Sequence, residues 1–259
     1  MDERFEKCID IVREAGDRLT EVRDIRIEEK SGYSDIVTQY DKLTQAFLIE
    51  RLAQIYPTAT FLGEEDGVAD LGGEYLFVID PIDGTTNFAK NYGYSAISVG
   101  CADREGLFFG IIYNPFLQDM YTAYRGEGAC KNGRPIHASR TDLKHSLVCL
   151  GTSPYYPELR NRSFVLAERL MDAAMDIRRS GSAALDLCSV AEGRNGVFFE
   201  CLLSPWDFAA GKLIVQEAGG ILTTLEGTPA AHTKKQSILA AGPRAHEDFL
   251  AFLEKQKDI

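Results

Sequence analysis

An apolar run that ends in two aspartates constrains the fold of this chain more than any other feature. Residues 75–79 are apolar, a pattern typical of a buried strand. The residues that follow are Asp80-Pro81-Ile82-Asp83-Gly84-Thr85-Thr86-Asn87-Phe88. Because Pro81 lacks an N–H and fixes its φ angle, we expect the strand to end at Asp80 and the chain to turn before Asp83. Two carboxylates at the end of a buried strand are costly unless a cation compensates their charge.

The residues after the second aspartate predict a site for phosphate. Gly84 allows close approach of the backbone, and the N–H groups of Gly84, Thr85 and Thr86 are expected to begin a helix, which favours phosphate. Magnesium takes oxygen ligands and usually keeps water and substrate phosphate in its coordination shell. The segment therefore predicts a magnesium-phosphate site.

The composition limits the partners of the chain. It has 259 residues, of which 45% are hydrophobic and 26% charged, so we expect a packed core. A net charge of −11 argues against nucleic acid or an anionic membrane as the main partner. Three features favour a cytoplasmic protein. The first residues are too charged for a signal peptide, and the cysteines are scattered without a Cys-x-x-Cys pair. No apolar run approaches the roughly 18 residues that a membrane span needs.

Helical and strand patterns alternate along the chain. Helices are expected at 5–22, 41–55, 158–174 and 206–218, through 185–190 and after Pro243, and strands at 59–62, 75–79, 95–101, 107–113, 119–124, 147–150 and 196–200. The three strands from 95 to 124 are joined by short turns and predict an antiparallel meander. The polar residues 30–35 are expected to form a loop. We expect one mixed α/β domain over 1–259, with a boundary near 140–150 if it has two lobes.

Four acids at predicted element ends are candidate ligands: Glu64, Asp80, Asp83 and Asp207. Taken alone, Glu64 fits a solvated loop, and Asp207 fits a helix-capping residue as well as a metal ligand. No histidine has ligand spacing, so each is expected on the surface or in a loop. The sequence also has no Ser-His or Cys-His nucleophile pattern, which leaves metal-activated water as the nucleophile. A haloacid-dehalogenase-type aspartate nucleophile is disfavoured because the two acids are three positions apart, not two.

Three segments together resemble the signatures of the inositol monophosphatase family. They are Gly63-Glu64-Glu65, the nine residues from Asp80 to Phe88, and Trp206-Asp207-Phe208-Ala209-Ala210-Gly211. Their order and spacing match over essentially the whole chain. The resemblance implies an α/β (α+β) fold, an αβαβα layered sandwich, and often a homodimer. It also implies magnesium-dependent, lithium-sensitive hydrolysis of phosphate monoesters.

Carried over residue by residue, the resemblance implies two to three Mg²⁺ ions. Glu64, Asp80 and the Ile82 carbonyl would hold the first ion. Asp80, Asp83 and Asp207 would hold the second, and Glu64 with water molecules would hold a weaker third. Two cations can clamp the attacking and leaving oxygens of an in-line displacement.

The resemblance also implies the remaining roles in the site. Glu64, Thr85 and Asp41 would be catalytic, with Thr85 and Asp41 orienting the attacking water. Lys30 matches a mobile loop near the site. The residues implied to contact the substrate are Asp83, Gly84, Thr85, Gly181, Ser182, Ala183, Glu200 and Asp207.

The sequence leaves the substrate open among small phosphorylated polyols and sugars. Inositol monophosphate is favoured because Thr86 and Asn87 follow Thr85, where histidinol and sulfur-nucleotide relatives more often carry lysine. Fructose 1,6-bisphosphate would need cations for its second phosphate, and the candidates are Arg160, Arg178 and Arg179. Histidinol phosphate and 3′-phosphoadenosine 5′-phosphate are further alternatives. A regulatory binding protein on this fold would be expected to lack a metal acid, whereas every one is present.

Overall fold

The computed structural model describes residues 2–32, 35–65, 67–68 and 73–256. Its helices are α1 (Glu3–Thr20), α2 (Gln39–Ile55), α3 (Thr85–Ala89), α4 (Pro157–Leu170), α5 (Ala183–Ala191), α6 (Pro205–Glu217) and α7 (Pro243–Glu254), with a short 3-10 helix, η1 (Leu143–His145). None of the helices in this described part has the length and apolar character needed to cross a bilayer.

The strands form three sheets. A two-stranded hairpin contains β1 (Ile27–Gly32) and β2 (Asp35–Thr38). An eight-stranded sheet in the order β10-β9-β8-β7-β6-β5-β3-β4 contains β3 (Ala59–Gly63), β4 (Gly67–Val68), β5 (Tyr75–Asp83), β6 (Ala96–Asp103), β7 (Gly106–Asn114), β8 (Asp119–Tyr124), β9 (Gly128–Lys131) and β10 (Arg134–Pro135). A five-stranded sheet in the order β12-β11-β13-β15-β14 contains β11 (Leu147–Leu150), β12 (Asp176–Arg178), β13 (Val197–Leu203), β14 (Ile221–Thr223) and β15 (Gln236–Ala241).

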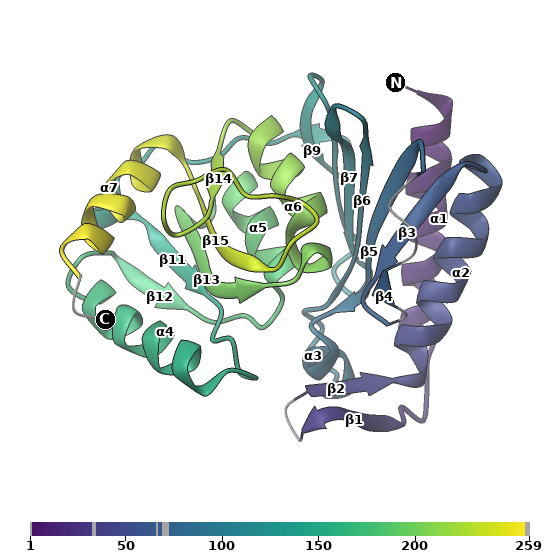
Figure 1. Ribbon diagram of the computed structural model, residues 1–259, viewed down its shortest axis with the longest axis horizontal. Helices are drawn as coiled ribbons and strands as arrows, with labels where there is room; N and C mark the ends of the chain where they lie inside the picture. The colour runs from purple at the N-terminus through teal and green to yellow at the C-terminus, as the bar shows by residue number, and fades with distance from the viewer. Residues whose placement is uncertain (1, 33–34, 66, 69–72, 257–259) are drawn as a thin grey trace.

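Helices and sheets alternate as five layers (Figure 1). Helices α1 and α2 cover one face of the eight-stranded sheet, α5 and α6 lie between the two large sheets, and α4 and α7 cover the far face of the five-stranded sheet. Separate hydrophobic clusters fill the spaces between these layers. The predicted αβαβα sandwich is therefore confirmed.

The outer helix α1 forms because its apolar residues recur at helical spacing. Phe5, Cys8, Val12 and Leu19 are buried against the sheet, and the Asp2 side chain accepts a hydrogen bond from the Arg4 N–H at the first turn. The antiparallel meander predicted from 95 to 124 is confirmed as β6, β7 and β8.

Helix α6 packs unusually close to the eight-stranded sheet. A Cβ on Gly110 of β7 would lie 2.6 Å from the backbone oxygen of Ala210, and one on Gly100 of β6 would lie 3.0 Å from the Ala210 nitrogen. These two glycines therefore let the helix backbone rest on the strands. The close packing fixes where the first turn of α6 lies relative to the sheet.

The predicted end of the strand at Asp80 is wrong. Strand β5 continues to Asp83, and its register with β6 shifts between Asp80, which pairs with Ser98, and Asp83, which pairs with Ala96. One extra residue is thus accommodated as a bulge, where Pro81 interrupts no regular ladder. The helix predicted after the motif is present as α3, with Gly84 at its N-cap position.

Other local predictions also need correction. The loop expected at 30–35 is a hairpin, because Lys30 lies in β1 and Asp35 in β2, while Tyr33 and Ser34 lie outside the described residues. His246 is buried in α7, where its Nε2 lies 2.8 Å from the Thr223 hydroxyl. The helix expected at 158–174 ends at Leu170, and β1, β2, β4, β9, β10, β12, β14 and β15 were not predicted.

Candidate active site

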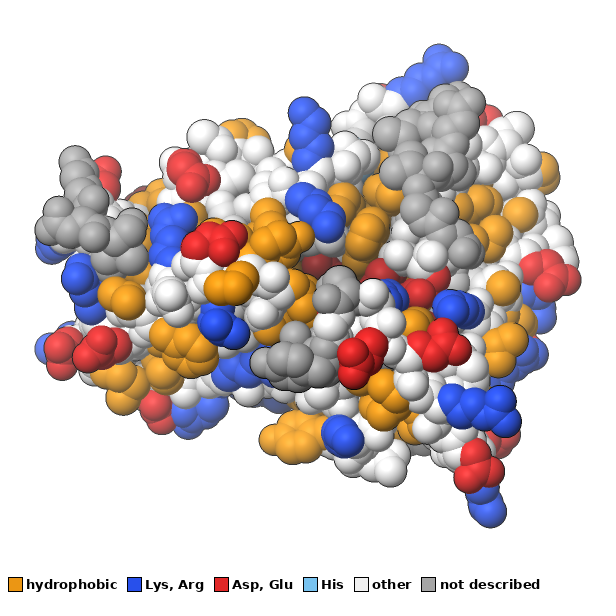
Figure 2. All heavy atoms as spheres, turned by 60° about the horizontal axis from the view of Figure 1, so that its bottom comes forward, with side chains coloured by type: hydrophobic (Ala, Val, Ile, Leu, Met, Phe, Trp, Pro, Cys, Tyr) orange, Lys and Arg blue, Asp and Glu red, His pale blue; other side chains and the backbone are white. Residues whose placement is uncertain are grey.

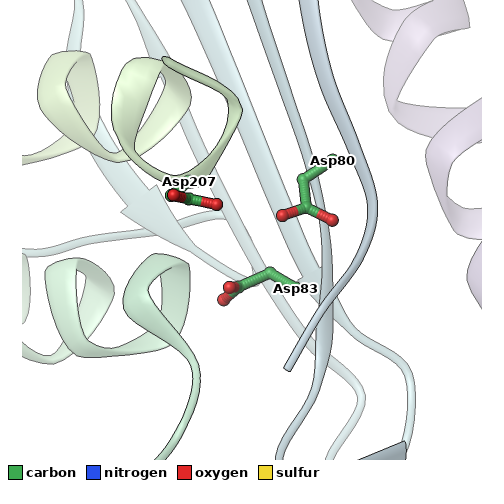
Figure 3. A group of neighbouring side chains, drawn as sticks. All are labelled: Asp80, Asp83 and Asp207. Carbon is green, nitrogen blue, oxygen red and sulfur yellow. The ribbon is translucent and has the colours of Figure 1, made fainter. Parts of the chain in front are cut away.

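Three aspartates from two distant segments of the chain meet between the large sheets (Figure 3). Asp80 and Asp83 come from the bulged part of β5, and Asp207 comes from the first turn of α6. One carboxylate oxygen of each lies within 4.8 Å of those of both others, and the three side chains point toward one another. These are three of the four acids that the sequence singled out.

Backbone groups fix the orientation of these carboxylates. Asp80 accepts a hydrogen bond from the Ile82 N–H at 3.0 Å, and Asp207 accepts one from the Ser204 N–H at 2.7 Å. Asp83 uses a single oxygen, Oδ2, to accept from the Ala184 N–H at 2.9 Å and from the Ser182 hydroxyl. The Ser204 contact is part of a capping box, so the same Asp207 carboxylate caps α6 and belongs to the cluster.

The cluster is electrostatically unfavourable without a cation. Burial raises the pKa of Asp80 and of Asp207 well above the usual range, and the neighbouring carboxylates raise both further. Burial also raises the pKa of Asp83 to about 6, although hydrogen bonds from Ser182 and Ala184 oppose the shift. Buried like charges are tolerated when a cation lies between them. Hard oxygen donors are also the ligands that Mg²⁺ prefers, so these residues fit a magnesium ion.

Glu64 lies beside this cluster but is paired with a lysine. Lys30 Nζ, from β1, lies 3.0 Å from Glu64 Oε1 and 2.6 Å from Glu65 Oε1. Glu64 is not among the three acids that gather within 4.8 Å in the described part of the chain. The fourth predicted acid therefore lies at the site with an ammonium group as its partner.

Asp41 and Thr85 are joined by a hydrogen bond, in agreement with the pairing that the resemblance implied. Asp41 Oδ2 accepts from the Thr38 N–H at 2.7 Å and the Thr38 hydroxyl at 2.6 Å, which together form the capping box of α2. Its other oxygen, Oδ1, lies 3.2 Å from the Thr85 hydroxyl, which is also 3.1 Å from the Ile82 carbonyl. Burial raises the pKa of Asp41 to about 6. The α2 capping box thus aims a buried carboxyl at Thr85.

The turn between β5 and α3, where the sequence predicted a phosphate site, requires glycine at position 84. Gly84 has φ +85°, a left-handed conformation that favours glycine. A Cβ there would lie 3.0 Å from the Gly181 carbonyl oxygen, so Gly84 also lets the loop before α5 approach closely. The predicted substrate residues Gly181, Ser182 and Ala183 are therefore beside the turn.

These groups surround one pocket of about 930 Å³ between the two large sheets. Figure 2 shows recessed acidic side chains there, with basic side chains close by. Most of the predicted site residues line the pocket: Glu64, Ile82, Asp83, Gly84, Thr85, Gly181, Ser182, Ala183, Glu200 and Asp207. Asp41 and Asp80, which are buried, are not among the described residues that line it.

Glu200 lies in β13 on the wall formed by the five-stranded sheet. Its Oε1 accepts from the Ser153 N–H at 2.9 Å, and burial raises its pKa to about 7. Ser153 has φ +41° and was not predicted as a site residue. No pattern in the sequence indicates Ser153, because its contact with Glu200 depends on the position of β13.

A further buried acid, Asp186 in α5, also lines the pocket and was missed. Its Oδ2 accepts from the Ser180 hydroxyl at 2.6 Å, whereas Oδ1 has no hydrogen-bond partner in the described part of the chain. Burial raises the pKa of Asp186 to about 7. Its position on the first turn of an apolar helix was the available signal, since an acid there usually faces water.

Comparison with known proteins agrees with this geometry. The model of the inositol monophosphatase family matches residues 1–258. An inositol-1-monophosphatase of Bacillus subtilis is 34% identical over 95% of both chains, and the Nus factor SuhB of Escherichia coli is 36% identical over 92% of this chain and 91% of its own. The solved structure of the extragenic suppressor protein suhB from Bartonella henselae has a TM-score of 0.89 at 32% identity and covers 98% of this chain and 99% of its own. The chain belongs to the inositol monophosphatase family.

Proposed function

We propose that this protein is a magnesium-dependent phosphatase that hydrolyses a phosphate monoester of a small polyol or sugar, with inositol monophosphate as the first candidate. The observation that carries the proposal is the meeting of Asp80, Asp83 and Asp207 beside the Gly84 turn. A cation site next to a phosphate-binding turn is suited to phosphate chemistry. The Bacillus subtilis relative, named as an inositol-1-monophosphatase, supports the choice of substrate.

The three aspartates would hold Mg²⁺, with Glu64 and the Ile82 carbonyl as further ligands for two to three ions. When bound, Mg²⁺ supplies positive charge that neutralises the phosphate oxygens and favours deprotonation of the attacking water. Glu64 would have to exchange its Lys30 contact for this role. The N–H groups of Gly84 and Thr85 would bind the phosphate.

The Asp41 and Thr85 pair would orient the attacking water. Asp41 is held by Thr38 and lies within hydrogen-bond distance of the Thr85 hydroxyl. When that hydroxyl donates to Asp41, its lone pairs are left to accept a hydrogen bond from a water molecule beside the phosphate. Gly181, Ser182, Ala183 and Glu200 would contact the alcohol that leaves.

The test is phosphate release with and without Mg²⁺ on inositol 1-phosphate, fructose 1,6-bisphosphate, histidinol phosphate and 3′-phosphoadenosine 5′-phosphate. Magnesium-dependent turnover that is best on inositol 1-phosphate would support the proposal, and a preference for another compound would keep the mechanism and change the substrate. The same proposal includes inhibition of turnover by lithium and a cytoplasmic location. It also includes a homodimer, which light scattering would detect.

A binding role is the second candidate, because a relative at 36% identity is named Nus factor SuhB and not a phosphatase. Absence of turnover on all four compounds, with Mg²⁺ present and the protein folded, would favour this role. Retention of the acids argues against it as the sole function, since a binding protein has no need for three adjacent carboxylates, two of them buried, that oppose folding.

A further inference from the structure

The side chain of Asn87 belongs to the nine-residue motif, but neither the aspartate cluster nor the proposed mechanism uses it. Asn87 lies in α3, three residues after Gly84, and is half-buried. Its amide nitrogen Nδ2 donates to the Tyr94 carbonyl oxygen at 2.8 Å and to the Ser180 carbonyl oxygen at 3.0 Å. An asparagine amide has two N–H groups, so these two bonds use both of them. One side chain therefore joins the motif to two other segments of the chain.

The bond from Asn87 to Ser180 connects elements of the two large sheets. Helix α3 follows β5 of the eight-stranded sheet, whereas Ser180 lies between β12 of the five-stranded sheet and α5. The two residues are 93 positions apart in the chain. The motif thus helps to fix the backbone at the start of the loop before α5.

A second anchor holds Ser180 at its side chain. The Ser180 hydroxyl donates a hydrogen bond to Asp186 Oδ2 at 2.6 Å, and Asp186 is buried in the first turn of α5. Ser180 is therefore held at its carbonyl oxygen by Asn87 and at its hydroxyl by Asp186. Because the two anchors belong to different helices, together they restrict both the position and the orientation of this residue.

The loop that begins at this anchored residue contacts the Gly84 turn and the aspartate cluster. Gly181 has φ +95°, and its carbonyl oxygen lies 3.0 Å from where a Cβ of Gly84 would be. A Cβ on Gly181 itself would lie 3.0 Å from Asn87 Nδ2, so the loop packs directly on the amide. One residue further, the Ser182 hydroxyl donates to Asp83. Displacement of the start of the loop would therefore move these groups away from the Gly84 turn.

We propose that Asn87 is a positioning residue that, together with Asp186, holds Ser180 and so places the loop before α5 against the leaving alcohol of the substrate. The inference rests on the proposed phosphatase function. The transferred phosphate would contact the metal and the N–H groups of Gly84 and Thr85, so its binding should not need the amide of Asn87. Loss of the amide should weaken binding of the alcohol part and not binding of phosphate.

The experiment measures kcat and KM for inositol 1-phosphate, and competitive inhibition by inorganic phosphate, in the wild type and in two variants. Asn87→Ala loses both amide contacts, so we expect KM to rise by roughly tenfold while kcat falls by less than about threefold. The inhibition constant for phosphate should stay within about twofold of the wild-type value. Ser180→Ala loses the contact with Asp186 alone and should raise KM by a smaller factor.

Asn132→Ala is the matched control for a loss of stability. Asn132 lies between β9 and β10 and accepts a hydrogen bond from the Met120 N–H at 2.8 Å, and it is not among the described residues that line the pocket. In urea unfolding this control should be less stable than the wild type, whereas its KM should be unchanged. A KM that rises in step with the loss of stability in all three variants would overturn the proposal.

The remaining outcomes also decide the question. An unchanged KM in Asn87→Ala would overturn the proposal, and so would equal weakening of inositol 1-phosphate and inorganic phosphate, because the amide would then act on the Gly84 turn. If Asn87→Ala does not fold, Ser180→Ala decides by the same criteria.

Absence of turnover in the wild type on all four compounds named above would mean that the proposed function fails. Calorimetry of inositol 1-phosphate with Ca²⁺ in place of Mg²⁺ then tests the inference separately. Weaker binding to Asn87→Ala than to the wild type would support it, and equal binding, or no binding to the wild type, would overturn it. If another of the four compounds is the best substrate, the kinetic comparison is made with that compound.

Discussion

Replacing Asp83 by asparagine tests whether the fold holds this carboxylate under electrostatic strain. An asparagine oxygen can still accept the hydrogen bonds from the Ala184 N–H and the Ser182 hydroxyl, so the local structure should persist. What the change removes is one negative charge from a group of three carboxylates, two of which are buried. Without metal, we therefore expect Asp83→Asn to stabilise the protein at neutral pH.

The magnitude follows from the pKa of Asp83, which is raised from 3.8 to about 6, chiefly by burial. Each pKa unit corresponds to about 1.4 kcal/mol, so the ionised carboxylate costs up to about 3 kcal/mol of folding free energy. A raised carboxyl pKa means that the folded state binds the proton more tightly than the unfolded state. The cost is therefore complete above about pH 6 and disappears as the pH falls toward 3.8.

The assay is urea unfolding of metal-free protein at about pH 7.5 and about pH 4.5, repeated with Mg²⁺ at the higher pH. The variant should gain stability at the higher pH, gain less at the lower pH, and lose most of the stabilisation that Mg²⁺ gives the wild type. Asp186→Asn is the matched control, because Asp186 is also buried with a raised pKa but lies outside the aspartate cluster. It should respond to Mg²⁺ as the wild type does.

Two results would refute this reasoning. If Asp83→Asn destabilises the metal-free protein equally at both pH values, the hydrogen bonds to the carboxylate outweigh its electrostatic cost. If Mg²⁺ stabilises the variant and the wild type equally, Asp83 does not contribute to the metal site.

Three further changes follow from the same contacts. Asp41→Asn should lower kcat by about 10²-fold or more with little change in KM, because Thr85 would lose the carboxylate that orients it; steady-state kinetics would show a KM effect instead if Asp41 serves binding. Gly110→Ala should cost about 2 kcal/mol or more in urea unfolding, since its Cβ would lie 2.6 Å from the α6 backbone. Lys30→Gln should tighten Mg²⁺ binding in calorimetry by freeing Glu64, whereas Lys42→Gln, which removes an exposed ion pair to Glu28, should not.

The sequence singled out candidate site residues most directly where those residues are neighbours in the chain, as in the segment from Asp80 to Phe88. The apolar strand that runs into Asp80 and Asp83 predicted a cation on physical grounds, because buried carboxylates need compensation. It could not predict the bulge, since a bulge depends on how β5 pairs with β6, and Pro81 by itself indicates a strand end. Asp80 and Asp83 do meet in the cluster, although the local structure predicted around them was wrong.

Asp207 illustrates a different limit. Its sequence context fitted a helix cap and a metal ligand equally well, and in the structure its carboxylate both caps α6 and belongs to the cluster. Its distance from β5 is set by Gly100 and Gly110, which let α6 rest on the sheet. Close packing of this kind leaves no periodic pattern in a single sequence. The prediction that Asp207 shares a metal site with Asp80 and Asp83 therefore came from the resemblance to the family.

Lys30, Ser153 and His246 depend on contacts between segments far apart in the chain. Lys30 meets Glu64 only because β1 and β2 form a hairpin where a loop was expected. Ser153 lies opposite Glu200 across β11 and β13, and His246 is buried because Thr223 offers it a hydrogen-bond partner. Polar residues are exposed on average, so their type alone predicts a surface position. Each of these three side chains is instead held by one specific hydrogen-bond or ion-pair partner that the sequence does not reveal.

Asp83 connects the packing of α5 against the eight-stranded sheet to the geometry of the aspartate cluster. Its backbone belongs to β5 of the eight-stranded sheet, yet the hydrogen bonds to its carboxylate come from Ser182 and Ala184 at the start of α5. Any displacement of α5 from the sheet would therefore rotate or release this carboxylate and disturb the cluster with Asp80 and Asp207. Conversely, a cation that binds the cluster would draw the carboxylate and the loop before α5 together. The Gly181 carbonyl oxygen lies 3.0 Å from where a Cβ of Gly84 would be, so occupancy of the metal site and the position of the loop before α5 should be coupled.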